Sequence, residues 1–223
     1  MISATIAASL ERLAGLRAVN GGSAEVVVVD GGSRDGTPET SRALCDRVLV
    51  APRGRAAQMN AGAAVAGGGV LLFLHADTDL PPDADRLIAA ALARHDAVWG
   101  RFDVAIAGRH PLLPVVATMM NLRSRLSGIA TGDQAIFVRR DAFEAVGGFP
   151  DIALMEDVAF SAALRRRARP CCLRARVTTS GRRWEKNGAL RTVLLMWRLR
   201  LAFFLGADPA DLARRYGYAP RDG

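Results

Sequence analysis

An α/β fold, in which helices cover both faces of a mixed, mainly parallel sheet, is predicted by three observations. Short β-branched or apolar runs alternate with helical segments over the first hundred residues. These runs are apolar throughout, as expected of strands that are buried on both faces. Half of the 223 residues are hydrophobic, which is enough for a substantial core.

The elements of the first half follow in order. Ile6, Leu10, Leu13 and Leu16 recur at helical spacing, so the chain opens with a helix. Strands are then predicted at 24–30, 46–51 and 70–74, and helices at 56–66 and 83–94. Beyond residue 97 the alternation is less regular. Strands are predicted at 97–106, 134–140 and 171–180, and helices at 112–127, 156–168, 190–206 and 210–217.

The charge of the chain has two explanations. There are 30 basic and 22 acidic residues, giving a net charge of +8, and Lys186 is the single lysine. One explanation of the basic charge is an arginine-rich coding bias. The other, of equal weight, is attraction to phosphate-bearing ligands or to an anionic membrane. Nucleic-acid binding is not predicted, because the arginines are dispersed and few aromatic residues accompany them.

The location of the chain is predicted to be the cytoplasm. Cys45, Cys171 and Cys172 are odd in number and lack metal-ligand spacing, which is typical of reduced thiols. No signal peptide is visible at the start, and no apolar window is long enough to span a bilayer.

Acidic residues follow two of the predicted strands. Asp30 ends the run EVVVV, and Asp77 and Asp79 follow the run VLLFL. Ligands of parallel sheets bind beyond the carboxyl ends of the strands. Two nearby carboxylates repel each other unless a shared cation neutralises them, so the pair favours a metal that bridges phosphates. A solvated turn is the alternative. Arg53 and Arg55 lie between these segments and offer cations to a nucleotide.

Several motifs together resemble a known family. VVVVDGGSRDGT, GRAAQMNAG and FLHADTD, followed by GDQAIFVRRDAFEAVGGFP, LMEDVAFSAALRRRA and SGRRWEKNG, are similar to segments of family 2 glycosyltransferases with the GT-A fold. The resemblance covers nearly the whole chain. It is nearest to a compact bacterial subgroup described as associated with radical SAM and selenium-domain proteins. In the last motif Ser180 stands where processive relatives carry glutamine.

The resemblance implies a role for individual residues. Asp77 and Asp79 would bind Mn²⁺ or Mg²⁺, and Asp157 would be the general base, with Glu156 beside it. The nucleotide sugar would contact Asp30, Arg53, Arg55, Asp77, Arg183 and Trp184, and the acceptor would contact Asp133 and Gln134. Other interpretations stay open: Asp157 as a helix cap, Arg183 in solvent, Trp184 in the core, and Asp133 and Gln134 as a turn. His75 is expected beside the site rather than as a metal ligand.

The activity that this implies is metal-dependent transfer of a sugar from a nucleotide-diphosphate sugar to an acceptor hydroxyl, with inversion. Two rivals are a metal-dependent nucleotidyltransferase and a nucleotide-binding pseudoenzyme. Family members open with a strand that precedes the first helix here, so the sheet is expected to lack it.

The predicted organisation is a GT-A domain over 1–189, with a nucleotide-sugar half (1–96) and an acceptor half (97–189), and a C-terminal helical extension over 190–223. The apolar, arginine-bearing helix 190–206 is predicted to pack on the protein or on a partner subunit as a homodimer. The alternative is that it lies on the inner face of a membrane near a lipid-linked acceptor.

Overall fold

A computed structural model describes residues 2–17, 23–94 and 96–218, and the side chains from Ile6 onward. The strands are β1 (Val27–Asp30), β2 (Arg47–Val50), β3 (Val70–Phe73), β4 (Thr78–Asp79), β5 (Trp99–Ala107), β6 (Ile136–Arg139) and β7 (Cys171–Ser180). The α-helices are α1 (Ile2–Leu13), α2 (Thr37–Arg42), α3 (Arg55–Val65), α4 (Ala84–Leu92), α5 (Leu113–Ser127), α6 (Arg140–Ala145), α7 (Glu156–Arg165), α8 (Arg182–Asn187), α9 (Ala189–Phe204) and α10 (Pro209–Tyr216).

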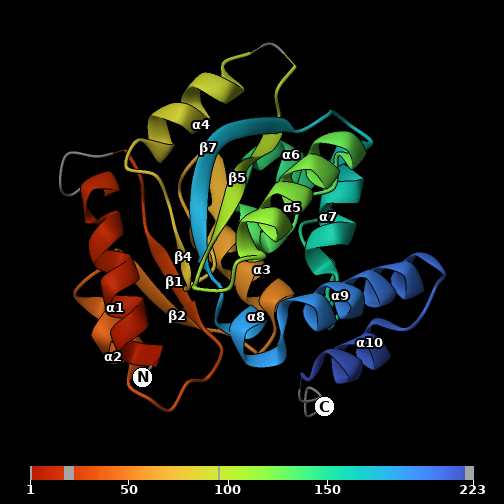
Figure 1. The fold of residues 1–223 in the computed structure, drawn as a ribbon. Helices are drawn as coiled ribbons and strands as arrows, with labels where there is room; N and C mark the ends of the chain where they lie inside the picture. The colour runs from red at the N-terminus through yellow and green to blue at the C-terminus, as the bar shows by residue number, and fades with distance from the viewer. Residues whose placement is uncertain (1, 18–22, 95, 219–223) are drawn as a thin grey trace.

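The strands form two sheets (Figure 1). β1 and β2 are a parallel pair by themselves, and the larger sheet has the order β3-β6-β5-β7-β4. Its longest ladder, β5 with β7, is parallel, whereas β3·β6, β5·β6 and β4·β7 are antiparallel. Parallel ladders hold most of the paired residues. The predicted α/β class with a mixed, mainly parallel sheet is confirmed.

The predicted elements correspond closely to those of the structure. The opening helix, the strands from β1 to β3 and the long segments of the second half all form where their patterns predict them. β4 and the short helices α6 and α8 were not predicted, because two to six residues carry too little periodicity.

Aromatic packing fixes one side of the larger sheet. Phe73 of β3 contacts Phe143, Phe149 and Phe160, with ring centroids 4.8–6.3 Å away, and Phe149 and Phe160 lie 4.0 Å apart. Edge-to-face and tilted pairs of this kind contribute about 0.5–1.5 kcal/mol each beyond their buried area. This cluster ties the end of β3 to the start of α7.

A buried charged network fixes α5 on β5. The Arg101 side chain is fully buried and pairs with Asp103; its Nε donates to Ser124 Oγ at 3.1 Å. Arg125 Nη2 donates to the second Asp103 oxygen at 2.6 Å. The paired carboxylate offsets the cost of burying the guanidinium.

The predicted C-terminal helical extension is confirmed as α9 and α10. Its buried side chains, Leu199 and Leu212, pack with Val158 of α7 in a core of their own. Residues 219–223 of the predicted extension lie outside the described residues, and the boundary at residue 189 stays a prediction. No helix within the described ranges is long and apolar enough to cross a bilayer.

Candidate active site

The acidic pair after β3 lies at the start of a short strand, β4. Asp77 is exposed, and its carbonyl oxygen accepts a hydrogen bond from the Ser180 amide at 3.2 Å. Thr78 points the other way, because side chains alternate along a strand, and its hydroxyl bonds to Thr179 at 3.2 Å. Asp79 lies in β4, and Asp77 lies in the turn directly before it.

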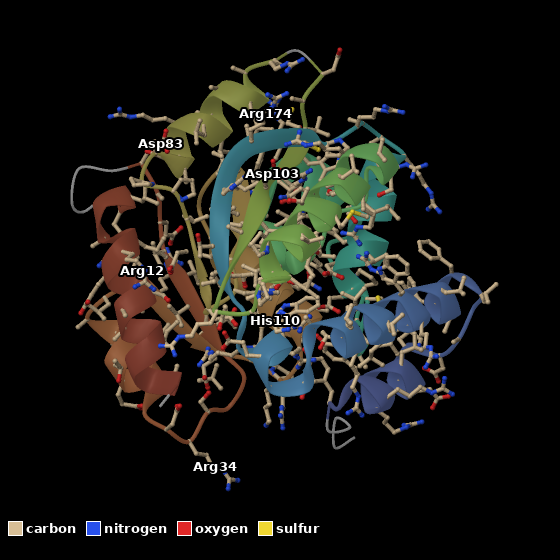
Figure 2. The ribbon with its side chains drawn as sticks, viewed as in Figure 1. Arg12, Arg34, Asp83, Asp103, His110 and Arg174 are labelled. Carbon is tan, nitrogen blue, oxygen red and sulfur yellow. The ribbon has the colours of Figure 1, made fainter. Side chains whose placement is uncertain are left out.

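Asp79 has a cationic partner from outside the sheet. Arg12 of α1, labelled in Figure 2, lies 2.6 Å from Asp79 Oδ1, and the Asp79 side chain is 37% exposed. Within the part of the chain that the structure describes, no group of three or more His, Cys, Asp or Glu side chains gathers as a metal site. Two carboxylates still fit Mg²⁺ or Mn²⁺, since magnesium is commonly bound by one or two carboxylates together with phosphate oxygens and water.

Asp30 closes the turn that follows β1. Its side chain is buried, and Oδ2 accepts hydrogen bonds from the amides of Gly32 at 2.8 Å and Ser33 at 2.7 Å. Asp30 therefore holds the glycine-rich loop in place at the carboxyl end of β1.

His75 joins the acidic segment to the loop before β6. Its Nδ1 lies 3.6 Å from Asp133 Oδ1, with the two side chains 24% and 46% exposed. Burial lowers the pKa of His75, but the Asp133 carboxylate raises it by more, so the net shift is upward. Burial raises the pKa of Asp133, yet His75 lowers it by more. A Cβ atom on Gly132 would lie 2.4 Å from the imidazole ring, so this approach requires glycine.

Asp157 is fixed by the same loop. One carboxylate oxygen accepts from the Gly132 amide at 2.8 Å and the other from the Val158 amide at 2.7 Å. Asp157 is not the N-cap of α7; that residue is Met155, which is buried with φ of 70°. A left-handed non-glycine residue costs of order 1–3 kcal/mol. This strain sets the direction in which Glu156 and Asp157 leave the backbone.

Glu156 points the other way, into the protein, and pairs with a predicted nucleotide-contacting residue. Its buried carboxylate lies 3.4 Å from Arg55 Nη1. Burial raises the pKa of Glu156, Asp157 raises it further, and Arg55 opposes both. Arg55 thus neutralises a buried acid as well as facing the site.

Two tyrosines of the C-terminal extension complete this cluster. Arg55 donates to the Tyr218 hydroxyl, and the Arg183 guanidinium lies 4.0 Å from the centre of the Tyr216 ring. Burial raises the pKa of each hydroxyl, and the two arginines oppose that shift. No sequence pattern predicted a site role for either tyrosine. They are the only two in the chain, and Tyr216 lies in the last predicted helix, 210–217, while Tyr218 directly follows it.

Arg123 of α5 was also missed. Its Nε and Nη2 atoms are buried and have no hydrogen-bond partner among the described residues. Burial lowers the pKa of Arg123, while Asp157 and Asp133 raise it. An unsatisfied guanidinium beside two site carboxylates is able to bind an anionic or polar ligand group.

The remaining predicted residues are less closely joined. Arg53 is exposed, and Trp184 is half-buried on α8. Gln134 is fully buried, and its Oε1 accepts from the Thr131 amide at 3.3 Å. That contact places the Gln134 side-chain amide inside the turn. The sequence had left a turn open as the alternative to acceptor binding at Gln134.

Solved structures share this fold. A mannosyltransferase from Pyrobaculum calidifontis, in complex with GDP-Man and Mn²⁺, aligns at a TM-score of 0.60 and 22% identity over 98% of this chain. TarS 1–349 from S. aureus aligns at 0.62 and 18% over 96%, and mannosyl-3-phosphoglycerate synthase from Rubrobacter xylanophilus at 0.57 and 16% over 92%. The chain covers 62%, 65% and 73% of those chains.

Sequence comparison gives the family. Among curated proteins, none matches the chain. The family described as Glycosyl transferase family 2 matches residues 3–147, which include Asp30, Arg55 and the acidic pair Asp77 and Asp79. The match spans more than half of the sequence and agrees with the arrangement of strands and acids described above. The chain therefore belongs to glycosyl transferase family 2.

Proposed function

We propose that this chain moves a sugar from a nucleotide-diphosphate sugar to an acceptor hydroxyl, with a divalent metal and with inversion at the anomeric carbon. The observation that carries the proposal is the fixed carboxylate of Asp157. It shares the 131–134 loop with His75, which lies two residues from Asp77. Family membership supports the same reaction class.

The proposed reaction is a single displacement. Asp157 accepts the proton of the acceptor hydroxyl while that oxygen forms its bond to the anomeric carbon. The bond from the anomeric carbon to the diphosphate oxygen breaks, and its electron pair leaves with the nucleoside diphosphate. With one base and no protein nucleophile, this sequence inverts the configuration. A metal held by Asp77 and Asp79 would neutralise the charge of the leaving group.

Donor binding is assigned to the carboxyl ends of β1 and β3. Asp30, Arg53 and Arg55 would contact the nucleotide, with Arg183 and Trp184 facing the diphosphate and sugar. In support, the Pyrobaculum mannosyltransferase was solved with GDP-Man and Mn²⁺, and TarS with UDP-GlcNAc. Asp133 and Gln134 would shape the acceptor side.

The acceptor is proposed to be lipid-linked, and the chain to lie at the inner face of a membrane. The outer face of α9 exposes Leu190, Leu194, Trp197, Leu201, Phe204 and Leu205, which are spaced as one helical stripe. Arg191 and Arg198 border it, and no acidic residue occurs between positions 189 and 206. Such a helix suits an anionic interface; burial of the same stripe in a homodimer is the alternative.

The deciding experiment compares Asp157→Asn with Glu156→Gln. Release of nucleoside diphosphate and product formation are measured with a panel of nucleotide sugars and Mn²⁺. Asp157→Asn should lower the transfer rate by roughly a hundredfold or more, because it removes a general base. Donor affinity, followed by the rise in melting temperature, should persist. Glu156→Gln, which alters a buried neighbour, should keep most of the transfer rate.

Other outcomes identify the rivals. Transfer within about tenfold of the wild type in Asp157→Asn would move the base elsewhere, since loss of a general base costs more than this. Pyrophosphate release from a nucleoside triphosphate would indicate a nucleotidyltransferase. Nucleotide binding without any product would indicate a pseudoenzyme.

A further inference from the structure

One arginine near the proposed base has two guanidinium nitrogens without a partner. The Nε and Nη2 atoms of Arg123, on α5, are buried and make no hydrogen bond to any residue that the structure describes. The side chain as a whole is half-buried, so part of it is open to solvent. A buried N–H group that lacks an acceptor is unfavourable, and more so when the group is charged. A ligand that accepts from both atoms would remove this cost.

The two unpaired atoms belong to one edge of the guanidinium. Nε–H and Nη2–H point the same way, so together they form a fork that matches two oxygens of a carboxylate or a phosphate. Arg125, two residues further along α5, shows the contrast. Its Nη1 donates to the Cys172 carbonyl at 3.1 Å and its Nη2 donates to Asp103 at 2.6 Å. Arg125 is thus bound within the protein, whereas Arg123 presents an unpaired bidentate fork.

The chain that follows α5 runs along α7 toward Asp157. Gly128 ends α5 with a φ of 68°, a left-handed conformation that reverses the chain. The returning segment then makes one hydrogen bond to each successive turn of α7. These bonds are Arg165 to the Ser127 carbonyl at 2.6 Å, the Ala130 amide to Ser161 at 3.2 Å, and the Gly132 amide to Asp157 at 2.8 Å. The first turns of α5 and of α7 therefore lie in the same direction from this reversal.

Arg123 lies one helical turn before the end of α5. A helical side chain leans toward the N-terminus of its own helix, which here is also the direction of Asp157. The charges agree with this position: burial lowers the pKa of Arg123, whereas Asp157 and Asp133 raise it. Both carboxylates are nevertheless held by other groups. Asp157 accepts from the amides of Gly132 and Val158, and Asp133 lies beside His75.

The surroundings of the fork indicate which ligand would supply the anion. In the proposed function, Asp157 takes the proton of the acceptor hydroxyl, so the acceptor lies against Asp157. The diphosphate of the donor is assigned instead to Arg55 and to a metal at Asp77 and Asp79. Arg123 belongs to the acceptor half, as Asp157 does. An anionic group at Arg123 would therefore be part of the acceptor.

We propose that the Nε and Nη2 edge of Arg123 binds a carboxylate or phosphate group of the acceptor and thereby orients the acceptor hydroxyl at Asp157. The assignment to the acceptor rests on the proposed function, whereas the anion subsite itself does not. Arg123 is then a specificity-determining residue. A neutral alcohol leaves the buried fork unsatisfied, so the site selects acceptors that carry a negative charge.

The test follows anion binding at Arg123 itself. Inorganic phosphate and, separately, acetate are titrated into the full chain at constant ionic strength without metal. Nuclear magnetic resonance follows the Arg123 Nε–H signal, assigned by its loss in Arg123→Lys, and the Gly132 amide as a second reporter. Arg123→Lys keeps the charge but lacks the fork. Arg174→Lys, at an exposed position of β7 labelled in Figure 2, is the matched control.

Saturable shifts of both signals are expected in the wild type, with phosphate, with acetate or with both. Arg123→Lys should weaken the binding about tenfold or more, because a charge-assisted bidentate contact is lost, and Arg174→Lys should leave it unchanged. Without the anion, Arg123→Met should keep or raise the melting temperature, since no internal hydrogen bond is removed.

Several results would overturn the proposal. The absence of saturable shifts, or equal affinity in Arg123→Lys, would remove the subsite. A melting temperature lowered by about 4 °C or more in Arg123→Met would mean that the guanidinium has a partner within the protein. UDP or GDP with Mg²⁺ is added last: displacement of the anion from Arg123 would assign the fork to the donor, whereas simultaneous binding supports the acceptor.

The same measurements separate this proposal from the proposed function, because they record equilibrium binding. Anion binding that depends on Arg123, in a chain that transfers no sugar, would contradict the proposed function and leave the subsite standing. Sugar transfer without such binding would retain the proposed function and overturn the subsite.

Discussion

At the scale of single residues, the carboxylates of the candidate site differ in the groups that they contact. Asp79 pairs with Arg12, Asp133 with His75 and Glu156 with Arg55, whereas Asp157 is held by two backbone amides. Among these four carboxylates, Asp157 is the one that is held by backbone amides rather than by a paired cation. This difference is the physical reason for placing proton transfer at Asp157.

The Arg12 ion pair should compete with the metal. Arg12→Gln frees the Asp79 carboxylate, so the affinity for Mn²⁺ with a nucleoside diphosphate should rise by a few-fold, in line with about 0.2–1 kcal/mol for an exposed pair. Asp79→Asn should abolish metal-dependent nucleotide binding with the fold intact. Calorimetric titration checks both. Weaker metal binding in Arg12→Gln, or unchanged binding in Asp79→Asn, would remove the metal assignment.

The His75–Asp133 pair predicts a pH dependence of stability. The raised pKa of His75 means that its contribution is fully present below the unfolded value of about 6.5 and is lost as pH rises through the folded value. The lowered pKa of Asp133 preserves the pair down to a pH below about 3.9.

His75→Asn should therefore destabilise the protein more at pH 5.5 than at pH 8.5. The difference should be under about 1 kcal/mol, since Asp133 is partly exposed. Urea unfolding at the two pH values measures it, with His110→Asn as the matched control. An equal loss at both pH values would mean that the ion pair contributes nothing.

At the scale of elements, α9 carries two apolar faces with different partners. Leu199 packs with α7 and α10, while the stripe through Trp197 and Phe204 is exposed. One helix therefore both attaches the extension to the domain and presents a surface.

The exposed stripe should bind anionic vesicles. Sedimentation with anionic and neutral liposomes should show binding to the anionic ones that weakens as salt rises, because arginines meet the headgroups. Trp197→Ser with Phe204→Ser should reduce it without unfolding, whereas Val50→Ser, an equally exposed change on β2, should not. A protein that stays in the supernatant at low salt would favour dimer or core packing.

At the scale of the whole molecule, the two sheets should differ in local stability. Among the described residues, β1 and β2 share no backbone ladder with the larger sheet, so their opening does not require that sheet to open. Amides of Val27–Asp30 should exchange about tenfold or more faster than those of Phe102–Ile106. Hydrogen exchange with mass spectrometry measures this. Equal protection in β1 and β5 would show one cooperative unit.

The sequence by itself determined the order of elements and the acids at the strand ends. Apolar runs such as VVVV and VLLFL predict buried strands, and Asp30, Asp77 and Asp157 follow from local position and the resemblance. These features are local, because a strand or a helix start is encoded within a few residues.

Only the tertiary structure decided the partners and the spaces between elements. The pairs Arg12–Asp79 and Arg55–Tyr218 join residues that are 67 and 163 positions apart. No local pattern encodes a contact of that separation. Periodicity in the sequence specifies which face of an element is apolar, but only tertiary packing specifies which other element that face contacts.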